Sequence, residues 1–182
     1  MYTIATQKQA SEKLDKNGTA RENARAAALA DRIVAGAEEL AAFAEGLSDE
    51  EWKTPVTEHD KRTIGVIVHH VGNLYPIEIG AVKEIAAGKA VTEVTWEAVA
   101  QINAQHAVDK ADVTKTEAIE FLRRNSREAA EAVRKLTDAE LDTAAPFSLS
   151  FGAPMTAQFV IEDHPLRHAW HHLFRIRKAV GR

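Results

Sequence analysis

The sequence contains no cysteine among its 182 residues. Disulfides, thiolate nucleophiles, iron–sulfur clusters and cysteine-based zinc sites are therefore excluded for this chain. Glycine, proline and aromatic residues are also scarce, at 9 Gly, 5 Pro and 6% aromatic, whereas alanine is abundant. Because alanine favours helices and a sandwich or barrel needs many turn residues, this composition predicts an all-α protein.

The chain also lacks an excess of positive charge and any long apolar run. Its formal net charge is -4 at pH 7, so no basic field is available to attract nucleic acid or an anionic membrane. No apolar stretch approaches the roughly 20 residues that span a bilayer, and the first twenty residues lack the apolar segment of a signal peptide. We therefore expect a cytoplasmic protein that binds neither nucleic acid nor a membrane.

Apolar residues recur at helical spacing in four long segments, 19–46, 63–87, 114–136 and 156–180. Four helices of this length predict an antiparallel four-helix bundle. Shorter helical elements are expected at 48–52, 95–110 and 137–140. The alternating segment 143–155, which contains Gly and Pro, predicts a loop or a small hairpin before the last helix. We expect residues 1–17 to form a polar arm and residues 18–182 a single domain.

Four of the eight histidines crowd the last predicted helix. His164, His168 and His172 follow one another at intervals of four residues, so in a regular helix their side chains project in the same direction. This line of histidines borders the apolar face rather than the solvent. Two imidazoles at this spacing can converge on one metal ion, and catalytic sites of this kind take a third protein ligand and keep one open position.

The second long helix offers two adjacent choices for the third ligand. His70 shares the most apolar stripe of that helix with Ile67 and Leu74, whereas His69 falls on its shoulder. We therefore expect His70 to point into the bundle and His69 not to. The residues predict a divalent metal site formed by His70, His168 and His172.

Simpler interpretations exist for several of these residues. An inward histidine is more often a hydrogen-bonded core residue than a ligand, and His106, which aligns with Val99 and Ile102, is expected to be a packing residue. The three tryptophans are expected to anchor the core. The basic residues of the last helix complement its C-terminal dipole, or form an anion clamp for a substrate carboxylate; they are Arg167, Arg175, Arg177, Lys178 and Arg182.

Two short motifs carry a resemblance to a known family. They are the segment 62–71 (RTIGVIVHHV) and His168-x-x-x-His172-x-x-Arg175. The chain resembles the DinB/YfiT-like superfamily of metal-binding four-helix bundles from about residue 19 to its end. The family's three histidines correspond to His70, His168 and His172. Arg175 occupies a position that is often Gln in that family.

The resemblance implies a three-histidine site for zinc, nickel or a similar ion, often in a homodimer. Its members include thiol-cofactor-dependent transferases, a thiol-dependent isomerase and proteins regarded as hydrolases. Because this chain has no cysteine, a thiol would come from a small-molecule cofactor. We expect a metal-dependent enzyme acting on a small molecule, with a water or a cofactor thiol in the open position. His164, Arg175 and His106 are candidates for a general base or an orienting residue, and His164 alternatively for a fourth ligand. The competing expectation is a non-catalytic stress-response or interaction protein with a structural or vestigial metal site.

Overall fold

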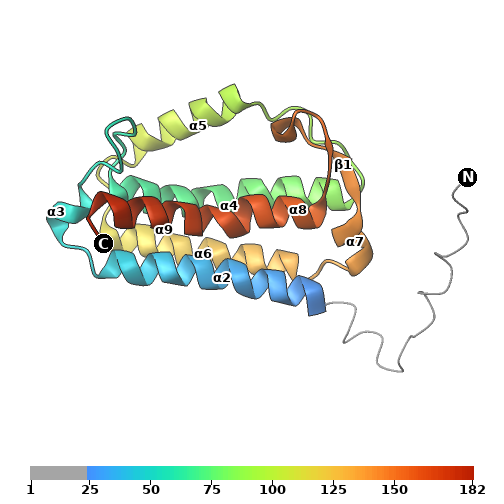
Figure 1. Ribbon diagram of the computed structural model, residues 1–182, viewed down its shortest axis with the longest axis horizontal. Helices are drawn as coiled ribbons and strands as arrows, with labels where there is room; N and C mark the ends of the chain where they lie inside the picture. The colour runs from blue at the N-terminus through green and yellow to red at the C-terminus, as the bar shows by residue number, and fades with distance from the viewer. Residues whose placement is uncertain (1–23) are drawn as a thin grey trace, which may run out of the picture.

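The computed structural model describes residues 24–182, and Figure 1 shows the arrangement of their helices. The predicted arm at 1–17 and the predicted helix start at residue 19 lie outside the described residues. Four long columns form a bundle. They are α2 (Ala24–Glu45), α4 (Ile64–Ala86), α6 (Lys115–Val133), and a last column made of α8 (Ala157–Ile161), η2 (Glu162–Leu166) and α9 (Arg167–Ala179).

The four-helix bundle is confirmed, and the structure adds the order of its helices. Both α6 and the last column pack against α2 and also against α4, so α2 and α4 are diagonal partners. Helix α5 (Trp96–Asp109) returns the chain along the outside of the bundle before α6 begins. Because of this long crossover, α4 and α6 run in the same direction, whereas α2 runs antiparallel to α6 (Figure 1).

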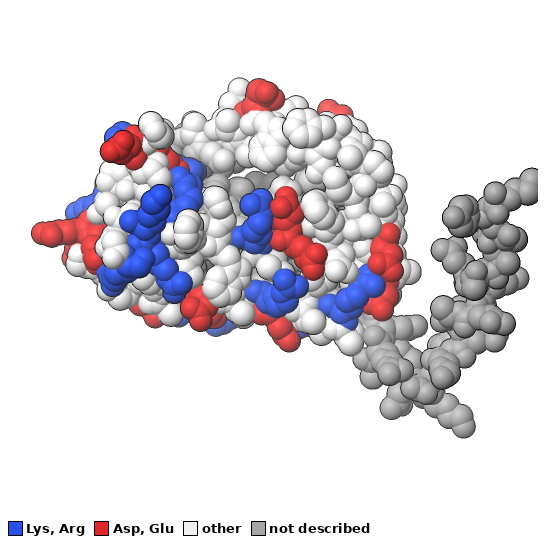
Figure 2. Space-filling model, viewed as in Figure 1, with Lys and Arg blue, Asp and Glu red and all other residues white. Residues whose placement is uncertain are grey.

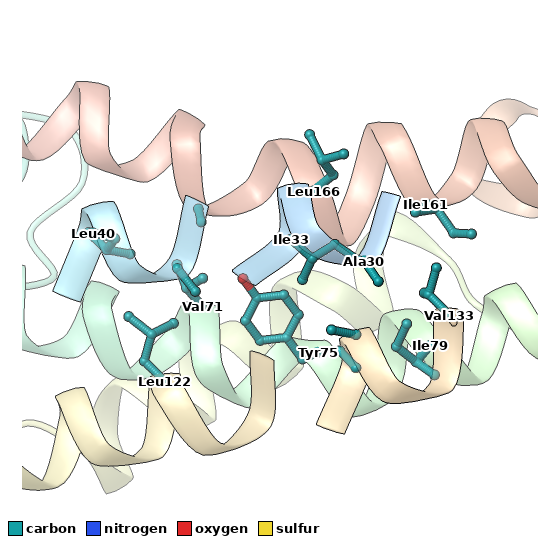
Figure 3. Close-up of a cluster of buried hydrophobic side chains, with 14 of the residues drawn as sticks. Ala30, Ile33, Leu40, Val71, Tyr75, Ile79, Leu122, Val133, Ile161 and Leu166 are labelled. Carbon is teal, nitrogen blue, oxygen red and sulfur yellow. The ribbon is translucent and has the colours of Figure 1, made fainter. Parts of the chain in front are cut away.

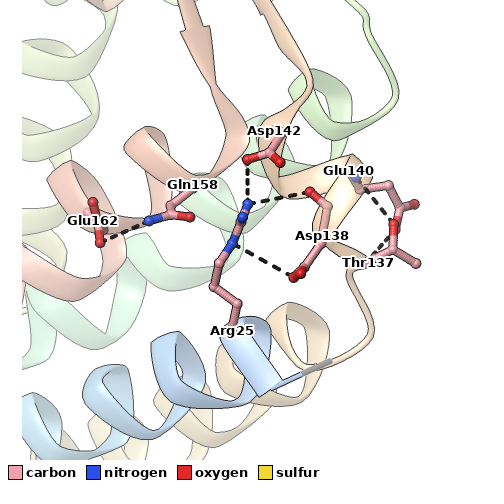
Figure 4. Close-up of polar contacts among 7 residues, drawn as sticks. All are labelled: Arg25, Thr137, Asp138, Glu140, Asp142, Gln158 and Glu162. Atoms are coloured by element: carbon pink, nitrogen blue, oxygen red, sulfur yellow. Dashed lines mark hydrogen bonds and ion pairs between the residues drawn. The ribbon is translucent and has the colours of Figure 1, made fainter. Parts of the chain in front are cut away.

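Short capped elements connect the columns. Helices α3 (Asp49–Trp52) and α7 (Asp138–Asp142) each begin with a capping box, formed by Ser48 with Glu51 and by Thr137 with Glu140. Figure 4 shows the second box, and beside it Arg25 of α2, which donates hydrogen bonds to Asp142 and to the carbonyl of Asp138. These contacts join the beginning of α2 to α7.

The predicted hairpin before the last helix is confirmed. Strands β1 (Ala144–Pro146) and β2 (Pro154–Thr156) pair antiparallel around the 3-10 turn η1 (Ser148–Ser150). At its tip Phe151 and Gly152 both have positive φ, the conformation that a tight reversal needs. A backbone bridge from Val91 to Phe147 fixes the hairpin to the segment between α4 and α5.

The interior is filled by aliphatic side chains, with Tyr75 at its centre (Figure 3). Trp52 is buried and donates its Nε1–H to the carbonyl of Val113 at 3.1 Å, as expected of a core anchor. The same expectation is wrong for Trp96 and Trp170, which are 54% and 42% exposed. Trp96 lies on α5 outside the bundle, and Trp170 covers Gly36, where an added Cβ would lie 2.8 Å from the indole nitrogen. None of the described helices is both long and apolar enough to cross a membrane.

Helix α4 continues through Pro76 because α6 compensates for the missing hydrogen bond. Proline has no N–H, so the carbonyl of Gly72, four residues earlier, loses its helical donor. Asn125 of α6 donates its side-chain amide to that carbonyl at 2.9 Å. A Cβ at Gly72 would come within 3.0 Å of Leu122 Cα, so the glycine also lets the two backbones approach. This contact fixes the register of α4 against α6.

Candidate metal centre

The structure brings the three predicted ligands together. His70 lies in α4, and His168 and His172 lie on successive turns of α9. Each ring offers one nitrogen, and these three nitrogens lie within 4.8 Å of one another. The ring centroids are 4.8 to 5.4 Å apart. Two segments separated by about a hundred residues therefore present imidazoles to one point.

The protein environment keeps two of these rings uncharged. His70 and His172 are only 3% and 5% exposed. Burial lowers the pKa of His70 to about 2 and also lowers the pKa of His172, and in both cases the neighbouring His168 adds to the effect. A metal binds the neutral imidazole, so this environment favours the ligand form.

The unpaired ring nitrogens are a second sign that the residues fit a metal ion. Within the described residues, the Nδ1 atoms of His70 and His172 are buried without a hydrogen-bond partner. Buried polar atoms are normally paired, and two unpaired imidazole nitrogens in one cluster carry a desolvation cost. A divalent ion bound by three imidazoles is a common arrangement in catalytic zinc sites. The donor set therefore fits the group that the sequence predicted.

A carboxylate that the sequence analysis missed lies beside the triad. Nδ1 of His168 is 3.0 Å from Oε1 of Glu78, although the contact falls outside hydrogen-bond geometry. Glu78 is only 9% exposed, and its other oxygen has no partner within residues 24–182. Carboxylates beside ligand histidines orient the ring and raise its basicity. The available signal was an acidic residue eight positions after His70, about two turns along the same helix face.

A cavity of about 610 Å³ opens above the three histidines. Its walls come from α4, α5, the hairpin and the last column, and Figure 2 shows the surface hollowed beneath α5. Most of the lining is apolar, and it includes Leu74, Ile77, Val99, Phe147 and Leu149. The triad is thus accessible from a space that has room for a small molecule.

Comparisons with known proteins give a family match for the sequence and a structural match for the fold. The family model of the DinB superfamily matches residues 32–174. The chain belongs to the DinB superfamily. Its structure is similar to that of YfiT from Bacillus subtilis, with a TM-score of 0.65 and 15% sequence identity over 93% of this chain and 90% of that chain. YfiT is described as "a probable metal-dependent hydrolase with an unusual four-helix bundle topology". At this identity the likeness concerns the fold. No curated protein matches the sequence.

In this member of the DinB superfamily, His164 lies apart from the triad. It lines the same cavity but does not belong to the group of three ligands found in the described residues. The regular helix expected here is interrupted by the π-helical turn η2, which contains Pro165 and changes the angular spacing between His164 and His168. Burial lowers the pKa of His164, and its ring packs edge-on against Phe147.

Arg175 belongs to an ion cluster at the beginning of α4. Its Nη2 lies 2.9 Å from Oδ2 of Asp60, and Arg62 donates two bonds of 2.8 Å to the same carboxylate. The hydrogen bonds from Arg62, reinforced by that from Arg175, hold the pKa of Asp60 well below its usual range. Arg62 lines the cavity, whereas Arg175 is absent from the cavity lining formed by the described residues.

His69 is buried, which its shoulder position on α4 does not predict. His69 is 3% exposed, and its Nδ1 lies 2.8 Å from Nε2 of His106 on α5. The ring of Phe121 on α6 stacks on its other side at 4.3 Å. Burial lowers the pKa of His69 to about 4 and is also the main cause of the lowered pKa of His106. The shoulder position is buried because α5 and α6 cover it, which the periodicity of α4 alone does not reveal.

Proposed function

We propose that this protein is a metal-dependent enzyme of the hydrolase type in which His70, His168 and His172 bind a zinc or nickel ion. The observation that carries the proposal is the convergence of these three imidazoles, two of them buried, in the lining of one cavity. YfiT, which has the same fold, is described as a probable metal-dependent hydrolase, and this supports the same class of chemistry. A divalent ion held there would supply Lewis acidity, lowering the pKa of a water or a small-molecule thiol in its open position.

The surrounding residues have separable roles in this proposal. Glu78 orients the ring of His168, since its carboxylate lies 3.0 Å from Nδ1. His164 accepts or donates a proton at the cavity wall, where burial keeps it uncharged at neutral pH. Arg175 is a positioning residue, because it reaches the site through Asp60, which holds Arg62. The apolar walls exclude bulk water from the reacting group.

The cavity favours catalysis over a purely structural metal site. Structural zinc sites are closed, with four protein ligands, whereas catalytic sites have three and an open position. Here three histidines form the group of ligands among the described residues, and they line the cavity. Because the chain has no cysteine, a thiol-dependent reaction would require a small-molecule thiol. The homodimer and the cytoplasmic location stay predictions.

Metal content provides the direct test. We expect wild-type protein supplemented with Zn²⁺ or Ni²⁺ to retain about one ion per chain after dialysis, measured by elemental analysis. The variants His70→Ala and His168→Ala should lose it. His171→Ala is the matched control, because His171 is next to His172 in the chain but lies outside the group of ligands. No bound metal in the wild-type protein would refute the proposal.

Turnover separates the enzyme from the structural alternative. Metal-loaded protein should hydrolyse members of a panel of esters and amides, or act on thiol conjugates when a thiol is added, and the His70→Ala variant should not. A large metal-dependent increase in melting temperature without turnover on either panel would favour a structural site.

A further inference from the structure

Arg62 lines the cavity, and one of its side-chain nitrogens has no hydrogen-bond partner among the described residues. Its Nε and Nη2 are bound to the two oxygens of Asp60, each at 2.8 Å. Its remaining nitrogen, Nη1, is buried and has no partner anywhere in residues 24–182. Arg62 lines the cavity together with His70 and Asn103. The carboxylate of Asp60 thus fixes the guanidinium plane and leaves one donor free to bind a ligand.

The cluster around Arg62 carries a net positive charge. Arg62 and Arg175 share the single carboxylate of Asp60, so two positive charges face one negative charge. Arg62 lines the same cavity as the three histidines, so its charge is available to a ligand bound there. A guanidinium N–H that is buried and unpaired is well suited to an anionic oxygen, because such charge-assisted bonds are strong.

The rest of the cavity indicates how such a ligand would lie. Glu78 and Glu84 line the cavity further along α4, and they would repel an anionic group at that end. Between the two ends the walls are apolar, with Leu74, Ile77 and Val99 among them. An anionic group is therefore favoured beside Arg62, with an apolar portion extending over the histidines towards the acidic end.

We infer that the substrate is a small apolar molecule with a carboxylate, and that Arg62 binds this carboxylate through Nη1. The inference rests on the proposed function, since it names the substrate class of the same site. Arg62 sets the end of the cavity at which the carboxylate lies, and the group to be cleaved lies near His70, His168 and His172. The clamp differs from the one expected in the last helix, because Arg167 and Arg175 are bound to Asp163 and Asp60.

Binding of octanoate and its neutral counterpart octanamide tests this inference. Titration calorimetry on zinc-supplemented wild-type protein should show octanoate binding at least tenfold more tightly than octanamide. The Arg62→Gln variant should lose at least tenfold in octanoate affinity and keep its octanamide affinity within threefold. The matched control is Arg167→Gln, which removes another arginine from the cavity lining and should leave both affinities within threefold.

The outcomes separate this inference from the proposed function. Equal affinity of the wild-type protein for the two probes would overturn it, even if the Arg62→Gln variant does not fold. Unchanged octanoate affinity in a folded Arg62→Gln variant would also overturn it, because the carboxylate would then bind elsewhere, for example to the zinc ion. Metal content is measured on the same samples. Arg62-dependent octanoate binding without retained metal would support the carboxylate site and refute the metal chemistry.

Discussion

The burial of His70 predicts a specific pH dependence of stability in the metal-free protein. In the folded state burial lowers the pKa of His70 to about 2, so the ring is uncharged there. In the unfolded chain the same imidazole takes up a proton near its ordinary pKa of about 6.5. Below that pH the unfolded state binds more protons than the folded state. The stability that is present above pH 6.5 is therefore lost progressively as the pH falls.

The expected magnitude follows from proton linkage. Each pH unit below 6.5 removes about 1.4 kcal/mol for one proton bound only by the unfolded state. Between pH 8 and pH 5 this amounts to about 2 kcal/mol for His70 alone. The variant His70→Gln has no imidazole to protonate at this position. Its free energy of unfolding should therefore fall by about 2 kcal/mol less than that of the wild-type protein over the same interval.

Urea unfolding in the presence of a chelator, followed by circular dichroism of the helices, measures this difference at each pH. His59→Gln is the matched control, because it removes an exposed imidazole from the loop before α4. The free energy of unfolding of this variant should change with pH in the same way as that of the wild-type protein. If the curves of wild-type protein and His70→Gln stay parallel from pH 8 to pH 5, the reasoning is refuted, and His70 must take up protons within the folded bundle.

Two further predictions concern the packing that holds the site. Tyr75→Phe should raise the free energy of unfolding by about 1 to 2 kcal/mol, because the Tyr75 hydroxyl is fully buried and unpaired within the described chain. A lower free energy of unfolding for this variant, measured by urea denaturation, would show that the hydroxyl has a hydrogen-bond partner. Asn125→Ala should lower the free energy of unfolding by about 1 to 3 kcal/mol, because the Gly72 carbonyl beside Pro76 loses its donor. An unchanged melting temperature in that variant would show that the carbonyl finds another donor.

The parts of the fold and site that could be predicted are those encoded within one helix. Apolar periodicity and capping residues locate the long helices, since Thr63 and Thr114 cap α4 and α6 as their positions suggest. The spacing of His168 and His172 and the apolar phase of His70 are also local properties. The three histidines meet because α4 and α9 pack against each other.

The remaining features depend on contacts between segments far apart in the sequence. The burial of His69 requires α5 to cover α4, and the contact of Glu78 with His168 requires the register between α4 and α9. The position of His164 depends on the π-helical turn around Pro165, which the spacing of histidines does not indicate. Periodicity within α4 or α9 carries no information about these relations.

The attachment of α5 has a consequence for the evolution of this protein. Among the residues of α5, all of which the structure describes, His106 alone is buried. Val99 and Asn103 face the cavity without forming part of the bundle interior. Substitutions at these two positions can change the shape of the cavity while the four columns and the three histidines keep their packing. New ligand preferences can thus arise on an unchanged framework, at little cost in folding stability.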